Sequence, residues 1–589
     1  KSTHIAYQGH LMVKKTDRNG HSFYWEYDPL NRCVHTWGDD GWQEGWLSYN
    51  PEKGYSRITD SAGGVTTYCY NEKQLVTRII NPLGPRVGSK TFQYTPYNEL
   101  YREIDEDGNL TGYDYDEKGF TTKITYPDQS MQQYLYDQDD RLLISISPGG
   151  KKETYTYYEN TKQLRVVIHA DKSMTQYTYT PQGLPATIKN DDKLLELTYD
   201  PHHNLIELKG NGKQMRWNYN FLGEVINVTD SDDSISSYEY DELGRVIHIR
   251  DNDSSQSLKY NAYDEVIAID RRGDSDMDSI RFDYTPLGSL QRRTQGNSRV
   301  FFDYDRMERL TKVVNEHDQV YTFTRNTLGH VTSEKGFDGI TKQYQHSGAG
   351  RVINMKGPGG MNTSYRYHGG RLSYVDYADG TWETYGYNKE GQLISAYNEQ
   401  NRIRLERDDY GRITSEKQDR GIGDPGHTIH SEYDKNGLRT KITSTIGADI
   451  IQNYDELGQL HHIQAIQQDK LWEAKINRNS HGQVTAYHFT GGVESGLAYD
   501  KAGRPTNHIV KTGFGRECYK REYTWNSASQ LLHSFDRIKN QGVNYCYDAL
   551  NQLLSASNPT EYKNPDAVGN LYETLDRSDR TYESGGRLR

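Results

Sequence analysis

The sequence predicts an all-β repeat protein, and three observations lead to that prediction. A Tyr-x-Tyr-Asp-x-x-Gly-like unit recurs 25 times between Tyr27 and Tyr547, and 19 of the 24 intervals are 20 to 22 residues long. Each unit contains two turn signals, and the residues between them alternate with period two, as in a strand. A fixed period of about 21 residues indicates one supersecondary unit that is copied and stacked. We therefore expect an array of β-hairpins rather than several ordinary domains.

The first turn of each unit follows its second tyrosine, which we call the anchor; Tyr240 in YEYDELGRVIHI is an example. The anchor is Tyr in 20 of the 25 copies, and the next residue is Asp, Asn, Thr or Ser in 23. Gly stands four residues after the anchor in 13 copies, and five more have Asn or Asp there: Asn31, Asn98, Asp140, Asp264 and Asn551. This pattern predicts a type I turn that ends in a residue with positive φ, the three-residue hairpin with a G1 bulge.

The segments on either side of this turn have the character of strands. Tyr-x-Tyr or Phe-x-Tyr precedes it, and Leu-, Val-, Ile- and Thr-rich stretches such as RVIHI (residues 245–249) follow it. A second polar turn then closes the unit, as in DEDGN from Asp105 and SPGGK from Ser147. Two strands of about seven residues and two turns fill the period, and no segment has the caps and 3.6-residue periodicity of a helix. We expect little or no helix.

The number of strands predicts the overall shape. About 50 strands at a spacing of about 4.8 Å would give a ribbon about 240 Å long, which cannot stay flat because sheets twist and coil. A tight solenoid would need aliphatic residues at its inward positions, whereas strand positions of both parities are often polar here, as in TTKI and SLQRR. The 49 Tyr residues suit a sheet wetted on both faces, since the ring packs while the hydroxyl meets water. We predict a large hollow β-shell.

Composition excludes several classes of protein. Hydrophobic residues are only 33%, but aromatic residues reach 12%, which separates this chain from disordered ones. The formal net charge of −12 argues against nucleic acid as a partner, because phosphate binding requires a basic face. No stretch approaches the roughly 18 apolar residues of a membrane span. The first residues, KSTHIAYQGH, contain neither an initiator Met nor the apolar region of a signal peptide.

The repeats divide the chain into three parts. Residues 1–26 lead into the array, residues 27–564 form the repeat shell, and residues 565–589 contain irregular final repeats. The chain stops within a repeat, at YESGGRLR, so we take it as a fragment of a longer protein.

One acidic run suggests calcium. Asp274, Asp276 and Asp278 form a D-x-D-x-D sequence, but a calcium loop of the EF-hand kind requires Gly at its sixth position and Glu at its twelfth. Those positions hold Ser279 and Thr285. We interpret the run as an acidic, solvated turn.

The cysteine and histidine residues show no ligand spacing. The four Cys residues form no C-x-x-C pair, so we read them as packing residues rather than zinc ligands: Cys33, Cys69, Cys518 and Cys546. Two histidine pairs are adjacent in sequence, and adjacent residues of a strand face opposite sides, so neither pair can chelate one metal: His202 with His203, and His461 with His462.

Two further patterns involve glycines and tryptophans. The glycines of GPGGM (residues 357–361) lack the following Lys-Ser/Thr of a phosphate loop, so we expect a turn. Trp37, Trp42 and Trp46 cluster in HTWGDDGWQEGW and have two interpretations: they stack on sugars, or, as we favour, they fill the narrow start of the shell. Nothing marks a Ser-His-Asp set, so we expect no catalytic, cofactor-binding or metal site in this chain.

The units resemble Rhs/YD repeats, the bacterial rearrangement-hotspot family, over nearly the whole chain. The resemblance rests on the signature Y-x-Y-D-x-x-G-R, as in YEYDELGRV from Tyr238, with further copies in NYDELGQL from Asn453 and AYDKAGRP from Ala498. It implies a spiral of β-strands that forms a hollow cocoon around a toxic C-terminal domain until delivery into a target cell. The insecticidal toxin complexes and the animal teneurins contain related shells.

The same resemblance implies partners and a location. Many members travel by a type VI secretion system, behind a PAAR-type domain and a VgrG-like spike, and an immunity protein guards the producing cell. The implied partners are therefore the protein's own C-terminal toxin, that plug and spike, and the immunity protein. The implied location is secreted, through a dedicated machine and without a signal peptide. Family cores end with a D-P-x-G-L-type self-cleavage motif that is absent from these residues, so we expect this chain not to be an enzyme.

A second function remained open. Other surface proteins carry aromatic repeats of about 20 residues that bind carbohydrate, but with G-W and Y-Y/F signatures in place of the Asp-x-x-Gly turn. A cell-surface or secreted carbohydrate-binding or adhesion repeat protein is therefore the alternative to the toxin shell.

Overall fold

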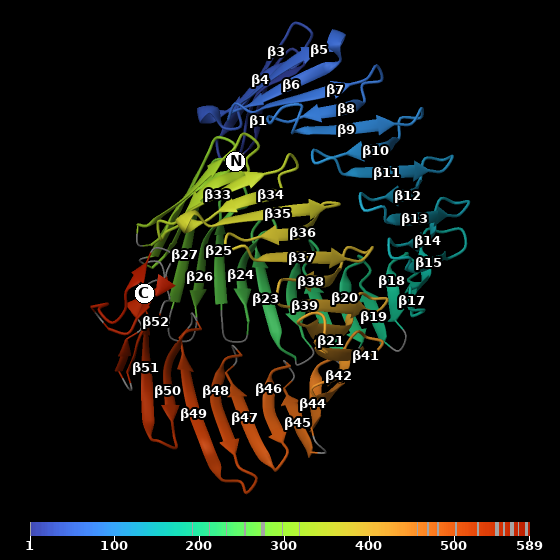
Figure 1. Cartoon of the computed structure of the whole chain (residues 1–589). Helices are drawn as coiled ribbons and strands as arrows, with labels where there is room; N and C mark the ends of the chain where they lie inside the picture. Colours follow the sequence, from blue (N-terminus) through green and yellow to red (C-terminus); the bar gives the residue numbers. More distant parts are fainter. Residues whose placement is uncertain are drawn as a thin grey trace.

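The fold is a single strip of antiparallel strands that coils into a spiral. The computed structural model describes residues 2–190, 193–210, 212–230, 233–251, 255–272, 277–296, 298–316, 318–455, 458–467, 470–479, 482–500, 503–526, 529–547, 553–557, 560–562, 564–565, 570–574, 576–583 and 587–588. Within them, 53 strands belong to one sheet, and each strand pairs with its neighbours in the chain. Figure 1 shows the strip descending from the N-terminal strands to the C-terminal ones.

The first part of the strip contains these strands: β1 (His4–Gln8), β2 (Leu11–Thr16), β3 (Ser22–Tyr27), β4 (Cys33–Gly38), β5 (Gly45–Asn50), β6 (Tyr55–Asp60), β7 (Val65–Tyr70), β8 (Val76–Ile80), β9 (Ser89–Tyr94), β10 (Leu100–Ile104), β11 (Leu110–Tyr115), β12 (Thr121–Thr125), β13 (Met131–Tyr136), β14 (Leu142–Ile146), β15 (Lys152–Tyr157), β16 (Leu164–Ile168), β17 (Met174–Tyr179), β18 (Pro185–Asn190), β19 (Lys193–Tyr199), β20 (Leu205–Gly210), β21 (Lys213–Tyr219), β22 (Val225–Thr229) and β23 (Ile235–Tyr240).

The second part continues with β24 (Val246–Arg250), β25 (Ser255–Tyr260), β26 (Val266–Arg272), β27 (Met277–Tyr284), β28 (Leu290–Gln295), β29 (Ser298–Tyr304), β30 (Leu310–Val314), β31 (Val320–Arg325), β32 (Val331–Lys335), β33 (Thr341–His346), β34 (Val352–Lys356), β35 (Asn362–His368), β36 (Arg371–Asp376), β37 (Trp382–Tyr387), β38 (Leu393–Tyr397), β39 (Arg402–Arg407), β40 (Ile413–Asp419), β41 (His427–Tyr433), β42 (Arg439–Ser444) and β43 (Asp449–Tyr454).

The last part contains β44 (Leu460–Gln467), β45 (Lys470–Arg478), β46 (Val484–Phe489), β47 (Val493–Tyr499), β48 (Pro505–Lys511), β49 (Glu517–Trp525), β50 (Leu531–Asp536), β51 (Gln541–Tyr547), β52 (Leu553–Ser557) and β53 (Thr560–Tyr562), followed by the short pairs β54 (Asn564–Pro565) with β55 (Leu571–Tyr572) and β56 (Tyr582–Glu583) with β57 (Arg587–Leu588). The helical elements of the described residues are three single 3₁₀ turns: η1 (Asp39–Gly41), η2 (Pro51–Lys53) and η3 (Pro358–Gly360). The predicted all-β class with little or no helix is confirmed.

The turns of each unit form the two rims of the strip. We call the turn after each anchor the anchor turn, such as residues 241–244, and the turn at the opposite rim the return turn, such as residues 105–108. The strand pairing shifts register immediately before the anchor, for example between Glu239 and Tyr240, as expected of a G1 bulge. Positive φ values occur at the predicted substitutes for glycine: Asn31, Asn98, Asp140 and Asp264. The remaining substitute, Asn551, lies outside the described residues.

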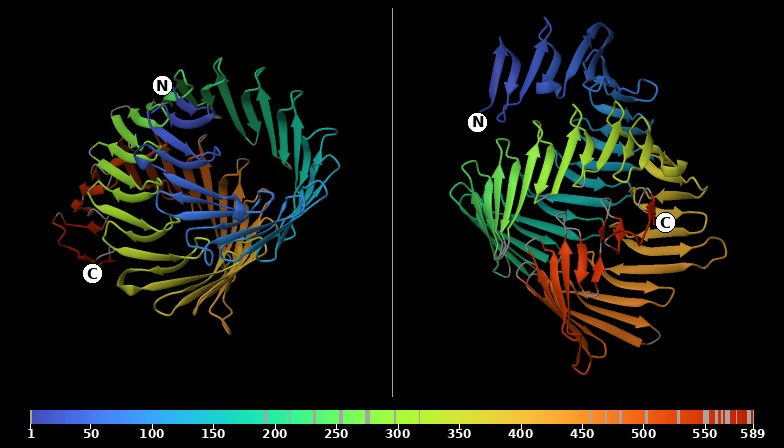
Figure 2. Two further views of the ribbon diagram at one scale, coloured as in Figure 1. Left: turned by 90° about the horizontal axis from the view of Figure 1, so that it is seen from above. Right: turned by 90° about the vertical axis from the view of Figure 1, so that its left-hand side faces the viewer.

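The strip returns to itself after 23 to 25 strands. The turn after β10 contacts the turn after β33, and the turn after β4 contacts the turn after β29. At about 4.8 Å per strand, one round of the spiral measures about 115 Å, or about 37 Å across. Figure 2 shows the strip, seen from above, curving around an open centre. The prediction of a wide hollow shell is confirmed.

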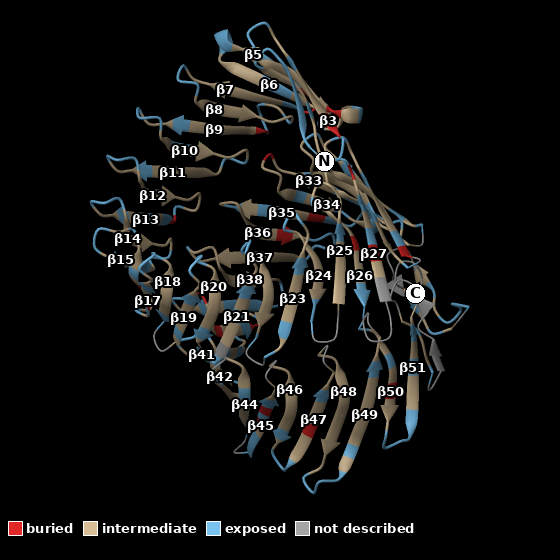
Figure 3. Cartoon of the chain, turned by 180° about the vertical axis from the view of Figure 1, so that it is seen from behind, coloured by how far each residue is buried: buried red, intermediate tan, exposed pale blue. Residues whose placement is uncertain are grey.

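The wall has almost no core of its own, because a single sheet leaves both faces open. The buried hydrophobic residues of the described chain are Val167, Ala268, Ile280, Val375, Ala474 and Ile476. Most other strand residues are half-buried, and Figure 3 shows intermediate exposure along the whole strip. Residues 1–26, which lead into the array, contain β1, β2 and most of β3, which pair within the same sheet. No helix among the described residues is long and apolar enough to cross a membrane.

Candidate functional site

The candidate functional feature is the wall itself, and its stability begins with the anchor. The hydroxyl of Tyr240 donates a hydrogen bond of 2.7 Å to the carbonyl oxygen of Val225, the first residue of β22. The anchor therefore ties its own strand to the beginning of the preceding repeat. The same bond recurs through the array: Tyr27, Tyr49, Tyr94, Tyr115, Tyr136, Tyr157, Tyr219, Tyr260, Tyr284, Tyr304, Tyr367, Tyr387, Tyr433, Tyr454, Tyr499 and Tyr547.

Most of the anchors that are not tyrosine keep this bond with a different donor. Arg325 and Arg407 donate to the carbonyls of Leu310 and Leu393, and Arg478 donates to that of Leu460. The indole of Trp525 donates to the carbonyl of Pro505 at 2.7 Å. The position thus favours a long side chain with a donor at its tip.

Where a repeat has both the Asp and the Arg of the signature, these two residues form a clamp around the anchor turn. Oδ1 of Asp241 accepts the backbone N–H groups of Leu243 and Arg245, and Oδ2 accepts Nε of Arg245 at 2.8 Å. The bond from Arg245 is the main reason that the pKa of Asp241 lies below its ordinary value. The Arg245 guanidinium also lies 4.9 Å from the ring centroid of the next anchor, Tyr260. The Arg of one repeat therefore holds its own turn and packs on the next anchor.

The register gives the wall two unlike faces. On one face, Phe302 of β29 pairs with Val313, and Val313 pairs with Tyr321. On the other face, Asp303 pairs with Lys312, and their side chains form an ion pair of 2.9 Å. The first face is aromatic and aliphatic, and the second is charged and more exposed. Alternation along each strand produces this difference, since successive side chains point to opposite sides.

Successive rounds of the spiral meet at a seam, which we define as the contacts between return turns of the first round and anchor turns of the second. Its strongest contact is a latch formed by Asp107, whose carboxylate accepts hydrogen bonds from Oγ of Ser347 at 2.7 Å, from N–H of Ala349 at 3.1 Å and from the guanidinium of Arg351. Arg351 also reaches Asp105 at 3.2 Å. Burial opposes ionisation of Asp105, but hydrogen bonds from Asn109 and Arg351 hold its pKa below the ordinary value.

Other seam contacts repeat this arrangement around the shell, with sequence separations of about 240 to 265 residues. They are Arg18 with Asp264, the N–H of Gln43 with the carbonyl of Arg306, Asn81 with Gly348, Asp128 with Arg371, Ser147 and Gly149 with Glu390, and Ser173 with Tyr410. The seam is thus made mostly of polar contacts that involve side chains of the turns, whereas the wall along the strip is made of backbone ladders.

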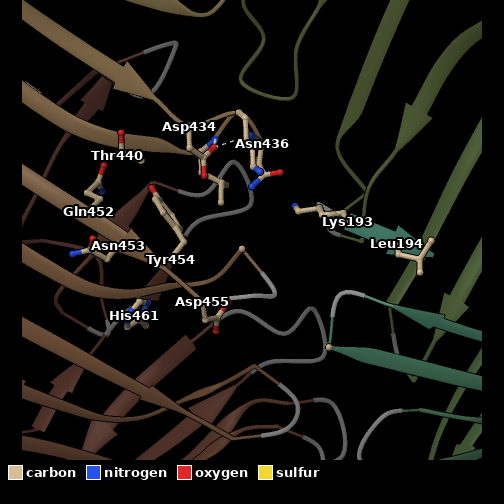
Figure 4. A pocket seen from close by; sticks show the side chains of 14 residues that line it. Lys193, Leu194, Asp434, Asn436, Thr440, Gln452, Asn453, Tyr454, Asp455 and His461 are labelled. Atoms are coloured by element: carbon tan, nitrogen blue, oxygen red, sulfur yellow. Dashed lines mark hydrogen bonds between the residues drawn. The ribbon is translucent and has the colours of Figure 1, made fainter. Parts of the chain in front are cut away.

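A cavity of about 800 Å³ lies along the continuation of this seam. Figure 4 shows it between Lys193 and Leu194, at the start of β19, and the anchor-turn residues Asp434, Asn436 and Asp455. Its lining is mixed and polar, and no group of three metal-ligating side chains occurs among the residues that the structure describes. The cavity is therefore a widening between two rounds of the wall.

The tryptophan cluster is divided by the structure. Trp37 stacks on Tyr24 with ring centroids 5.3 Å apart, and His35 lies between Trp37 at 4.2 Å and Trp46 at 5.3 Å. Trp46 ends this stack and is 43% exposed. Trp42 makes no aromatic contact within the described chain and caps η1 with its backbone. The stack contributes to the first hairpins, and its exposed end leaves both sequence interpretations open.

The remaining sequence candidates occupy scattered positions. The four cysteines are free: Cys33 and Cys69 are half-buried, and Cys518 and Cys546 are exposed. His203 takes a glycine-like turn position at φ 71°, and His461 lines the seam cavity. The GPGGM segment forms the turn around η3, with the N–H of Gly357 bonded to the carbonyl of Met361. Asp274 and Asp276 lie outside the described residues, as does the side chain of Asp278.

Comparisons with known proteins agree with this architecture. A family model described as the teneurin YD-shell matches residues 188–323. The double-stranded DNA deaminase toxin A of Burkholderia cenocepacia (strain H111) is 24% identical over 374 residues, which cover 52% of this chain and 26% of that toxin.

Solved structures show the same fold. The crystal structure of TcdB2–TccC3 aligns with 100% of this chain at a TM-score of 0.50 and 14% identity, and that of TcdB2–TccC3–Cdc42 aligns with 100% at 0.50 and 11%. The aligned parts make up 35% and 42% of those chains. The chain thus spans about a quarter of the deaminase toxin and about a third of the first solved chain.

Proposed function

We propose that this chain, which is similar to YD-repeat shell proteins, forms the wall of a container: the Rhs core of a secreted bacterial toxin, which encloses a C-terminal toxin domain until delivery. The observation that supports this most directly is the single-layered spiral of 53 strands around an open centre. In such a wall nearly all of the backbone lies in one sheet that encloses a space, and almost no packed core is formed.

The size of that space constrains the cargo. Side chains on the inner face reduce the diameter of about 37 Å by about 10 Å. A compact domain of 100 residues has a radius of gyration of about 13 Å, which corresponds to a diameter of about 34 Å. A folded toxin of that size is about as wide as the space itself, so we propose that the cargo is held in an extended or loosely folded state. The mechanism is steric, because the wall separates the toxin from its substrate and from the producing cell.

The similar proteins support a link with toxins. One relative is by name a double-stranded DNA deaminase toxin, and the similar solved shells are TcdB2–TccC3 structures. We propose accordingly that the catalytic activity of the full protein belongs to its cargo and not to this chain. A PAAR-type plug, a VgrG-like spike, an immunity protein and export by a type VI machine are the further partners and route of this proposal.

We further propose that the charged face of the wall lines the inner space, because an apolar lining would hold the cargo. The residues to probe are Lys312, on the charged face, and Val313, on the apolar face of the same strand. Each would be replaced by Cys in a background without Cys33, Cys69, Cys518 and Cys546. A maleimide carrying a large polymer should react with the Cys at position 313 and not with the one at 312. The reverse result contradicts the proposed orientation.

The main experiment compares the native particle of the full-length protein with its denatured chains by mass spectrometry. The proposal expects a smaller C-terminal polypeptide that stays with the shell and separates only on denaturation. Protease added to the native particle should spare this polypeptide, and Asp107→Asn combined with Asp128→Asn, which weakens the seam, should expose it sooner. The proposal that the chain is a container is overturned by an empty particle, or by a cargo that is digested equally fast in the natural protein and in the double variant.

A second candidate is a carbohydrate-binding surface, which the 43% exposed Trp46 at the end of its aromatic stack favours. A glycan array tests it with this chain and with Trp46→Ala as the matched control. Binding that disappears in the variant supports the second candidate, and an array without signal at high protein concentration removes it.

A further inference from the structure

One repeat in the second round replaces the arginine–tyrosine clamp by two histidines. His346 occupies an anchor position, and His330 occupies the position that Arg245 holds in its own repeat. In several other repeats this pair is a guanidinium over a tyrosine ring, as with Arg245 over Tyr260 and Arg412 over Tyr433. Here the two imidazole rings face each other with centroids 5.1 Å apart and planes tilted by 35°.

The two rings lack the bonds that the clamp makes elsewhere. The Nδ1 atoms of His330 and His346 are both buried, and neither has a hydrogen-bond partner within the described chain. Arg245 by contrast donates to the carbonyl of Asn261 in the following anchor turn. The histidine pair therefore supports its neighbours by ring packing, without the hydrogen bonds of the clamp.

This pair lies directly under the seam latch. His346 immediately precedes the anchor turn whose Ser347 and Ala349 bind Asp107. Gly350, the positive-φ residue of that turn at 83°, packs on His330 so closely that a Cβ atom there would lie 2.7 Å from Cε1 and Nε2 of the ring. A movement of the His330 ring would therefore displace the turn that carries the latch.

Charged groups of both signs surround the pair. Arg325, the preceding anchor, donates to the carbonyl of Gly329, next to His330, and Arg351 follows the latch turn. Across the seam are Asp105 and Asp107, which Arg351 already pairs, and Glu106, which lies against Gly348. Glu334, on the strand between the two histidines, is bonded to Tyr344 at 2.8 Å.

We propose that the His330–His346 pair makes the seam acid-sensitive: the packed rings support the latch turn, and protonation of His346 loosens this turn and releases Asp107. The strands keep their backbone ladders, so the two rounds part at the latch while the sheet remains intact. This device does not depend on what the shell encloses.

The direction of the pH dependence follows from the surroundings of the pair. Burial, and secondarily the His330 ring, lower the pKa of His346 below its ordinary value. The closed latch therefore holds the ring neutral, while an opened latch lets it take a proton near the ordinary pKa of about 6.5. The histidine pair therefore supports the latch turn fully above about pH 6.5, and this support weakens as the pH falls below that value. Each proton shifts the opening equilibrium by at most about tenfold per pH unit.

Hydrogen–deuterium exchange of the whole chain at pH 7.5, 6.5 and 5.5, corrected for the intrinsic exchange rate, tests the proposal. Peptides that contain residues 347–351 should exchange up to about tenfold faster at pH 5.5 than at 6.5. The clamped turn at residues 241–244 should change little and serves as the internal control. Equal behaviour of the two turns overturns the proposal.

The matched variant restores the clamp of the other repeats. His330→Arg with His346→Tyr should remove the acid response and leave exchange at pH 7.5 unchanged. Asp107→Asn should instead give fast exchange at residues 347–351 at every pH, which shows that the readout reports the latch. Should the double variant fail to fold, His346→Tyr alone must still reduce the response. An acid response that survives in the restored variant refutes the role of the histidines.

Discussion

The anchor hydroxyl offers a sharp test of how the wall is held together. Tyr240→Phe removes only the oxygen that donates a 2.7 Å bond to Val225 and leaves the ring in place. A neutral hydrogen bond contributes about 0.5–1.5 kcal/mol net, and a carbonyl left without its partner adds to the loss when it is shielded from water. Because the anchor is half-buried, we expect a local destabilisation of about 1–2 kcal/mol. This corresponds to a factor of about 5 to 30 in the opening equilibrium.

Local hydrogen exchange is the suitable assay for this variant. A repeat array opens in parts rather than in one step, so a single melting temperature would dilute the effect. Peptides from β22 and β23 should exchange about 5 to 30 times faster in Tyr240→Phe, whereas peptides several repeats away should not change. The matched control is Tyr238→Phe on the same strand and face, because the hydroxyl of Tyr238 makes no hydrogen bond within the described chain. Equal effects of the two substitutions would refute the anchor bond as a source of stability.

Three further predictions follow from the same contacts. Arg325→Tyr should change hydrogen exchange at β30 and β31 little, since a tyrosine restores the usual donor. Arg325→Leu should instead destabilise these strands by about 1.5–3 kcal/mol, because it removes the charge-assisted bonds to Leu310. Equal losses of stability in the two variants would contradict the need for a donor. Burial raises the pKa of the anchor tyrosines. Their contribution to stability is therefore complete below about pH 10 and is lost as the pH rises through the raised pKa values. Circular dichroism between pH 9 and 12 should show this loss of structure, and an unchanged spectrum would contradict it. Asp128→Asn removes the partly exposed ion pair with Arg371 and should weaken the seam by at most about 1 kcal/mol, and by less in 1 M salt. Hydrogen exchange at residues 126–130 and 368–371 measures this weakening. An effect that does not depend on salt would show that the pair is not electrostatic.

The local structure of this protein follows from its sequence, because turn chemistry acts over four residues. Asn31, Asn98, Asp140 and Asp264 were predicted at positions of positive φ from their spacing to the anchor, and all four have it. The alternation of Tyr-x-Tyr likewise indicated the strands. Their number, together with the twist of sheets, predicted a wide shell. Each of these inferences needed only neighbouring residues and the general geometry of a sheet.

The anchor bonds and the seam contacts depend on the register and curvature of the sheet, and no local sequence pattern specifies these. The bond from Tyr240 to Val225 spans 15 residues and exists because the bulge and pairing bring that carbonyl to the hydroxyl. Arg325 and Trp525 donate the same bond as an anchor tyrosine, but this is evident only once the accepting carbonyl is known. The sequence shows only that both residues replace tyrosine at the anchor position. His330 and His346 were overlooked for the same reason, and their departure from the repeat consensus was the available signal.

By itself, the sequence determined the repeat, its turns, its strands and the all-β shell, because these arise from interactions between residues close in the chain. Only the tertiary structure decided which residues meet across the seam. The partner of Asp107 is about 240 residues away, and its identity depends on the 23 to 25 strands that complete one round. Small twists and bends add up over all those strands, so the curvature of the whole sheet, rather than any single repeat, places one round upon the next.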